Sequence, residues 1–135
     1  KSYINSLKSK YNNMVFYGAI FNTNEQLNIA KECIAGVYGG DAGLSVVHYM
    51  AFGLPVIVHS EIKKHMGPEP SYVIDNVNGL KFIRGDVLSL AEKITILKVD
   101  EKLRCRLANN ALNTFIKLQN PSMAAKILKI ISGTK

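Results

Sequence analysis

The chain has 135 residues, the length of one ordinary domain, and 47% of them are apolar, which is enough for a buried core. It has no apolar run of about eighteen residues, and no apolar stretch follows its first residues, so we expect neither a membrane span nor a signal peptide. The net charge of +7 lies at the ends: residues 1–13 contribute +3, residues 14–97 contribute −2 and residues 98–135 contribute +6. Basic ends suit an anionic membrane surface or the solvated faces of amphipathic helices, and we favour the second.

The first part of the chain alternates between predicted helices and strands. Because it starts without Met, we expect a fragment that begins inside a helix. In chain order the pattern predicts a helix at residues 1–10, a strand at 14–18, a helix from about 22 to 33, a strand at 34–38, a glycine-rich turn at 39–43, a helix at 44–52, a strand at 55–59, a loop at 61–71, a short strand or turn at 72–79 and a strand at 80–83. The strand at 55–59 is apolar without alternation, as expected when both faces of a strand are covered.

Three helices are predicted after these strands. Asp86 caps the first, Asp100 caps the second, and Asn120 caps the third with Pro121 at its first helical position, while Gly133 ends it. The side chains expected to face inward are Leu90, Ala91, Ile94 and Leu97 in the first helix, and Leu103, Leu107, Ala111, Phe115 and Leu118 in the second. This order of elements predicts an α/β domain, a Rossmann-like parallel sheet flanked by helices.

The cysteines and histidines do not have the spacing of a metal site. Cys33 and Cys105 lie in apolar-periodic stretches, so we expect two buried free thiols. No Cys/His cluster occurs, and we expect no metal.

The glycine-rich turn, Gly39-Gly40-Asp41-Ala42-Gly43, carries the strongest chemical signal. Glycines let a ligand approach the backbone closely, and the free N–H groups where a helix begins suit a phosphate. The turn also follows a parallel strand, at the edge where open α/β sheets bind ligands. It is not the G-x-G-x-x-G dinucleotide fingerprint, and from spacing alone it could equally be a tight connection.

The residues after this turn resemble a known family. Residues 43–58, Gly-Leu-Ser-Val-Val-His-Tyr-Met-Ala-Phe-Gly-Leu-Pro-Val-Ile-Val, are similar to the signature of group-1 (family four) retaining glycosyltransferases. That signature has a glutamate, then Gly-Phe-Gly-Leu-Ser/Thr, a second glutamate eight residues after the first, and Met-Ala-x-Gly-x-Pro-Val. Further steps in family order are Val-Phe-Tyr-Gly at 15–18, Gly-Pro-Glu at 67–69, Asn-Gly-Leu-Lys-Phe at 78–82 and Gly-Asp at 85–86. The resemblance spans residues 14 to about 118 and implies the C-terminal half of a GT-B fold.

The resemblance also implies roles for the matched positions. Those expected to meet a nucleotide sugar are Gly40, Asp41, Ala42 and Gly43 at the sugar and diphosphate, Leu44 and Ser45 at the diphosphate, and His48 at the ribose. The two family glutamates are replaced by Gly40 and His48. Asp41 could meet the sugar from another angle, and His48 could still bond a ribose hydroxyl. Without the resemblance, His48 reads as an ordinary helix histidine.

Other candidates surround this turn. His59 ends its strand at the carboxyl edge, and Glu69 lies in the following loop, so both are candidates for the cleft. We expect His65 at the surface and Lys63 and Lys64 to be solvated. No catalytic residue is assigned, because the basic residues that stabilise the leaving diphosphate in relatives lie upstream of this chain.

The function that the resemblance implies is a retaining, hexosyl-type glycosyltransferase of surface-polysaccharide biosynthesis. It would move a sugar from a nucleotide sugar to a saccharide or lipid-linked acceptor without a cofactor. Residues 1–135 would form a single, truncated donor-binding domain, inactive alone, whose partner is an N-terminal acceptor domain. The expected location is the cytoplasm, with candidate contact at the inner membrane face, and no nucleic acid is expected as a partner.

Two other readings stay open. The loss of both family glutamates favours a non-catalytic Rossmann-like module that binds a nucleotide or a protein. A flavodoxin-like signalling domain would require an acidic cluster at the strand ends, which the sequence lacks.

Overall fold

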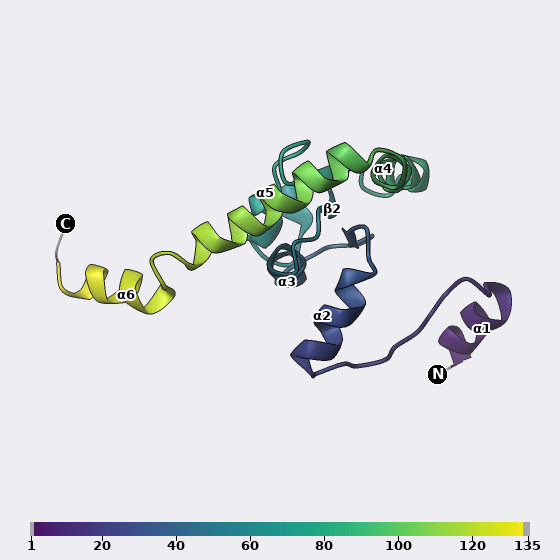
Figure 1. Cartoon of the computed structure of the whole chain (residues 1–135), viewed down its shortest axis with the longest axis horizontal. Helices are drawn as coiled ribbons and strands as arrows, with labels where there is room; N and C mark the ends of the chain where they lie inside the picture. The colour runs from purple at the N-terminus through teal and green to yellow at the C-terminus, as the bar shows by residue number, and fades with distance from the viewer. Residues whose placement is uncertain (1, 134–135) are drawn as a thin grey trace.

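The computed structural model describes residues 2–133 as a small α/β body with a helix extending from it at each end (Figure 1). The elements are α1 (Ser2–Lys10), α2 (Thr23–Lys31), β1 (Gly36–Val37), α3 (Ser45–Ala51), β2 (Val56–His59), the short 3-10 turns η1 (Ile62–Lys64) and η2 (Glu69–Tyr72), β3 (Gly79–Phe82), α4 (Val87–Val99), α5 (Glu101–Gln119) and α6 (Met123–Ile131).

The three strands form one parallel sheet in the order β1-β2-β3. Val56 of β2 is in register with Gly36 of β1 on one side and with Gly79 of β3 on the other. Every residue of β2 is buried, as its apolar run predicted. The predicted parallel α/β fold is therefore confirmed, although β1 is only two residues long.

The sheet separates two apolar clusters. Val56 and Val58 of β2 face one cluster, which α3 supplies with Val46 and Met50, and Ile57 faces the other. The second cluster contains Leu80, Phe82 and Leu97, from β3 and α4. Helix α5 contributes to both, with Ala111 in the first and Leu107 in the second. The alternation of β2 side chains thus divides the core, and α5 joins its two parts.

The helix caps predicted at Asp86 and Asp100 are present, and Asn22 caps the helix predicted from about residue 22. Asn22 accepts the N–H of Glu25 at 3.1 Å and begins α2. Asp86 accepts the N–H of Ser89 at 2.9 Å to begin α4, and Asp100 accepts that of Leu103 at 2.8 Å to begin α5. These caps depend on residues close in sequence, which is why the sequence located them.

The expected start of the last helix is wrong. Asn120 ends α5, where its N–H donates to the carbonyl of Lys117, and Ser122 caps α6 by accepting the N–H of Ala125 at 3.2 Å. Asn120 and Ser122 are both good cap residues. Because Asn120 already ends α5, the N-terminal cap of α6 lies two residues further along the chain, at Ser122.

The predicted strand at residues 14–18 is not formed. The segment has no regular secondary structure and pairs with no strand of the described structure, and Val15 and Tyr17 are 73% and 60% exposed. Tyr17 and Ile20 instead line an apolar cavity of about 300 Å³ beside α2, β1 and α3. An apolar run becomes a strand only when a neighbouring backbone completes its hydrogen bonds, and none lies beside this one.

Two expectations about burial are also wrong. Cys33 and Cys105 are free thiols as expected, but both are exposed. In α4, Leu97 is buried whereas Ala91 and Ile94 are exposed. This helix is apolar on nearly all sides, so spacing alone does not identify its inner face. In the described part of the chain, no helix has the length and apolar character needed to cross a membrane.

Candidate functional site

The carboxyl ends of the three strands meet at one edge because the strands are parallel. The glycine-rich turn follows β1, His59 is the last residue of β2, and Arg84 lies two residues beyond β3. This arrangement brings together the side chains of Asp41, His59 and Arg84, which are far apart in the sequence.

Asp41 is held by two partners. Nε2 of the fully buried His59 lies 3.0 Å from Oδ1 of Asp41. Arg84 donates from Nε to the same oxygen at 3.2 Å and from its Nη2 to Oδ2 at 3.4 Å. The hydrogen bond from Arg84, followed by that from His59, lowers the pKa of Asp41 below its ordinary value of 3.8. Asp41 is therefore an ionised carboxylate with both oxygens occupied.

His65 completes this group, although the sequence placed it at the surface. Its ring is stacked on that of His59, with 3.6 Å between ring centres and 9° between planes. The N–H of Ala42 donates to Nδ1 of His65 at 3.0 Å, and Nε2 lies 3.0 Å from the carbonyl oxygen of His59. An N–H can donate only to an unprotonated nitrogen, so the proton lies on Nε2 and the ring is neutral. His65 thereby ties the glycine-rich turn to the end of β2.

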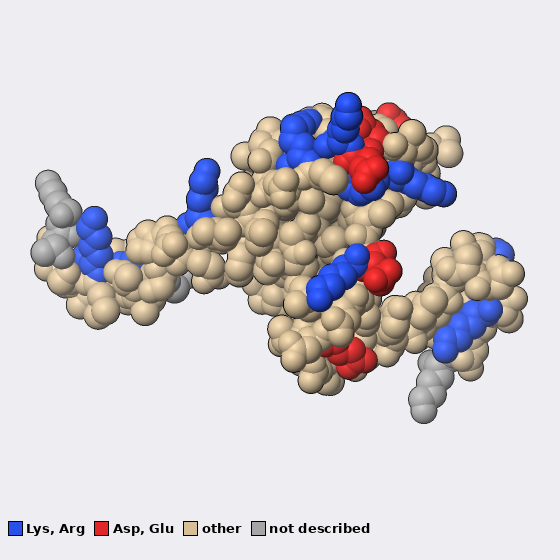
Figure 2. Space-filling model, in the orientation of Figure 1, with Lys and Arg blue, Asp and Glu red and all other residues tan. Residues whose placement is uncertain are grey.

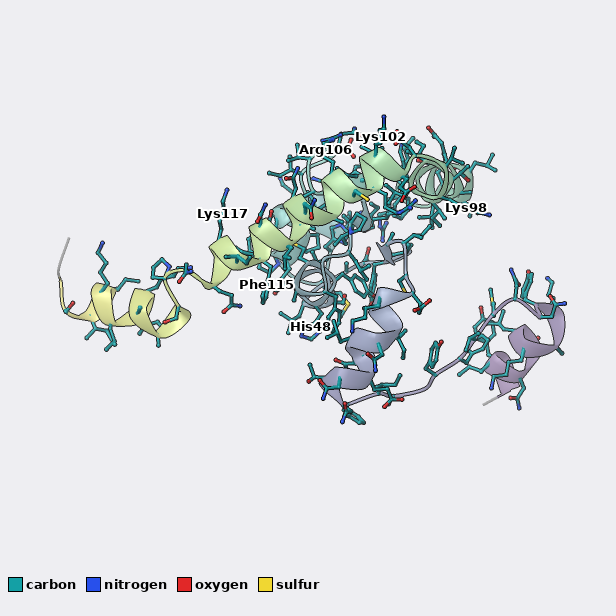
Figure 3. All side chains as sticks on the ribbon, in the orientation of Figure 1. His48, Lys98, Lys102, Arg106, Phe115 and Lys117 are labelled. Atoms are coloured by element: carbon teal, nitrogen blue, oxygen red, sulfur yellow. The ribbon has the colours of Figure 1, made fainter. Side chains whose placement is uncertain are left out.

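The other predicted site residues are placed less uniformly. Ala42 is fully buried, whereas Gly40 and Leu44 are exposed and Gly43 and Ser45 are half-buried. His48 is exposed on α3, on the opposite side of the body from Lys102 (Figure 3). Its side chain makes no hydrogen bond to any described residue, so it remains available to a ligand.

Glu69 does not join the Asp41 group. Its carboxylate lies over Gly67, and its buried Oε2 has no hydrogen-bond partner within residues 2–133. A Cβ at position 67 would meet only this carboxylate, the far end of a flexible side chain that can move aside. Glu69 therefore lies in the loop before β3, apart from the Asp41 group.

A hollow of about 350 Å³ opens beside the Asp41 group, lined by Gly39, Gly40, Asp41, Arg84 and Gly85. The backbone N–H groups of Gly39, Gly40 and Gly43 donate to no other described residue. Among the described residues, no set of three His, Cys, Asp or Glu side chains is arranged to hold a metal ion. The hollow thus offers hydrogen-bond donors, and it suits a ligand rich in acceptor oxygens.

Lowering the pH is expected to destabilise the fold through His65. Burial lowers the pKa of His65 below its ordinary value of 6.5, so the unfolded chain takes up this proton first. Stability from the neutral ring is complete above about pH 6.5 and is lost as the pH falls through the lowered folded value. Asp41, whose pKa lies below 3.8, stays ionised in this range.

Urea unfolding of the wild type and His65→Gln, at about pH 7.5 and about pH 5.5, tests this expectation. The free energy of unfolding should fall more for the wild type than for the variant. Equal falls would show that His65 does not carry this pH dependence.

Comparisons with known proteins agree with this architecture. Residues 6–114 match the family model described as glycosyl transferases group 1. The fold is similar to the C-terminal domain of a group 1 glycosyl transferase, LpcC, from Francisella tularensis, with a TM-score of 0.69 and 21% identity over 86% of this chain and 62% of that one. It is also similar to sucrose-phosphate synthase from Thermosynechococcus elongatus, with a TM-score of 0.75 and 21% identity over 97% of this chain and 32% of that one.

The chain therefore spans less than two thirds of either solved structure. No curated protein matches it. The likenesses in fold confirm the expected C-terminal half of a GT-B fold. Because the family model covers most of the sequence, the chain belongs to the group 1 family of glycosyl transferases.

Proposed function

We propose that this domain binds the nucleotide-sugar donor of a glycosyltransferase at the carboxyl edge of its sheet. The observation that carries the proposal is the hollow beside the glycine-rich turn, which Gly39 and Gly40 line and where their backbone N–H groups donate to no other described residue. Such groups suit the oxygens of a diphosphate and of sugar hydroxyls. Ala42 is not among the donors, because its N–H is taken by His65.

The loss of the first family glutamate needs a physical substitute. Gly40 has no side chain, and the oxygens of Asp41 are engaged by Arg84 and His59. Asp41 is therefore better placed to stabilise the conformation of the turn than to bind the sugar by itself. The backbone of the turn is left as the main source of contacts to the donor.

The complete reaction requires more than this domain. We propose a retaining transfer of a hexose to a saccharide or lipid-linked acceptor, in the synthesis of a surface polysaccharide in the cytoplasm. The partner would be an N-terminal domain carrying the acceptor site. The likeness of this chain to a domain described as the C-terminal domain of a group 1 glycosyl transferase supports this division. No cofactor is proposed.

His48→Ala is expected to weaken nucleotide binding about three- to tenfold, because it removes one hydrogen bond to the ribose. Binding of UDP, GDP and ADP and of their sugars is measured by chemical-shift titration, which detects the weak affinity of a half-site. Asn109→Ala, an exposed change on α5, is the matched control.

Three results are informative. Equal binding by wild type and His48→Ala would remove the ribose role of His48. Binding of none of the nucleotides would contradict the proposed function and favour the alternative of a protein-binding module. Unchanged binding by the control is required in either case.

Helix α6 favours a second contact, with an anionic membrane surface. It extends beyond α5, away from the sheet, and carries lysines but no acidic residue (Figures 1 and 2). Ile130 and Ile131 are 80% and 77% exposed, and Lys126 and Lys129 lie on the same short helix. An exposed apolar face beside lysines is typical of a helix lying in a membrane interface.

Vesicle sedimentation tests this contact. More protein should sediment with phosphatidylglycerol vesicles than with phosphatidylcholine vesicles, and Ile130→Asn should reduce the bound fraction severalfold. Val87→Asn, which removes an apolar side chain 76% exposed on α4, is the control and should bind like the wild type. If both variants lose binding equally, or the wild type does not sediment, α6 is not a membrane contact.

A further inference from the structure

Arg84 lies at the hollow with part of its guanidinium unused. An arginine has five N–H donors, and Arg84 directs two of them, one on Nε and one on Nη2, to Asp41. Three donors remain, and within residues 2–133 they have no partner. The side chain is 42% exposed and lines the same hollow as Gly39 and Gly40.

The ion pair with Asp41 restrains the side chain of Arg84. Asp41 is itself anchored by the buried His59, so the ion pair holds the guanidinium over the glycine-rich turn. Both carboxylate oxygens of Asp41 are engaged, and Asp41 therefore offers the ligand little acceptor capacity. Arg84 lines the hollow, so its three remaining donors lie beside the unused backbone N–H groups of Gly39 and Gly40.

From this geometry we propose that Arg84, together with the backbone N–H groups of Gly39 and Gly40, binds an anionic group of the ligand. A guanidinium fork matches the oxygens of a phosphate or a carboxylate. The anion is either the diphosphate of the donor or a carboxylate on its sugar. This assignment rests on the proposed function, because both groups belong to a nucleotide sugar.

The ion pair with Asp41 positions the side chain of Arg84. An arginine placed without such a partner would lose more side-chain freedom on binding, which weakens affinity. Asp41 thus acts as a positioning residue and Arg84 as the residue that touches the ligand. Glu61, which also attracts Arg84, is the other acid near the guanidinium.

Titration of the isotope-labelled chain, followed by NMR, tests the assignment. The probes are inorganic pyrophosphate, UDP, UDP-glucose and UDP-glucuronate, and the signals read are the Arg84 side chain and the amides of Gly39 and Gly40. Arg84→Gln removes the charge, and Arg84→Lys keeps the charge but not the fork. Lys102→Gln removes an equal charge from α5, on the opposite side of the body from His48, and is the matched control (Figure 3).

If the diphosphate occupies the site, Arg84→Gln should weaken the binding of UDP, UDP-glucose and UDP-glucuronate about tenfold or more. The factor should be the same for all three ligands. If the sugar carboxylate occupies it, only UDP-glucuronate should weaken. Arg84→Lys should lose part of the affinity in either case, and Lys102→Gln none. Equal loss in Arg84→Gln and Lys102→Gln would overturn the site, because general charge would then explain the effect.

The failures of the two proposals are distinguishable. Nucleotide binding by the wild type that Arg84→Gln leaves unchanged overturns the role of Arg84 and leaves the proposed function standing. Pyrophosphate that shifts the Arg84 and glycine signals while no nucleotide binds supports the anion site and contradicts the proposed function. No shift with any probe overturns both.

Discussion

Gly79→Ala is expected to destabilise the domain by about 2 to 3 kcal/mol, the upper range for overpacking in a well-packed interior. A Cβ at Gly79 would collide with the carbonyl oxygen of Val56 and with the side chain of Val73. Val56 is the residue of β2 that is in register with Gly79, and it is fully buried. Relief therefore requires β2 and β3 to separate, since no rotation of a side chain moves the carbonyl away.

Gly40→Ala is the matched control for this change. A Cβ at Gly40 meets no atom within 4 Å, and the residue does not adopt the left-handed backbone conformation. The free energy of unfolding of the Gly40→Ala variant should stay within about 0.5 kcal/mol of the wild-type value. Both variants are measured by urea unfolding with circular dichroism. Equal stabilities would mean that the strands tolerate a methyl group between them, contrary to the contact described.

Asn78→Ala is expected to cost about 3 kcal/mol or more, because it leaves several buried groups unpaired. Asn78 is only 1% exposed. Its Oδ1 accepts the N–H of Ile74 at 2.7 Å, and its Nδ2 donates to the carbonyl of Tyr72 at 2.9 Å and to Oγ1 of Thr114 at 3.0 Å. The side chain thus ties the loop before β3 to α5.

Asn113→Ala provides the comparison, since Asn113 lies exposed on the same helix as Thr114. It should unfold at nearly the wild-type urea concentration, while Asn78→Ala shifts the midpoint strongly to lower urea. A small loss for Asn78→Ala would indicate that water replaces its partners. The expected result makes the Asn-Gly step at residues 78–79 a structural feature, in which one residue bonds the loop and the next lets the strands approach.

The sequence predicted those parts of the fold that depend on neighbouring residues. The caps at Asp86 and Asp100 and the apolar run of β2 are local signals, and the structure confirms them. The predicted strand at residues 14–18 was wrong, because a strand forms only beside a partner strand and a local sequence pattern does not show whether one is present. The inner face of α4 was predicted correctly at Leu90 and Leu97 but not at Ala91 and Ile94, because an evenly apolar helix has no polar side to contrast with it.

The candidate site was predicted in part for the same reason. The glycine-rich turn comes just after β1 and His59 is the last residue of β2, so the parallel topology was enough to bring them to one edge. Arg84 and His65 were missed as site residues because both lie in irregular loops, where no periodicity indicates which way a side chain points. The one available signal for His65 was its position in the loop that begins at the end of β2, six residues after His59.

Helix α5 has a consequence for how this domain opens. It supplies Ala111 to the cluster on one face of the sheet and Leu107 to the cluster on the other. Departure of this helix would expose both faces at once, so neither cluster can remain stable while the other is lost. The sheet and its two coverings should therefore exchange their amide protons as one cooperative unit, whereas α1 and α6, which extend away from the body, should exchange independently of it.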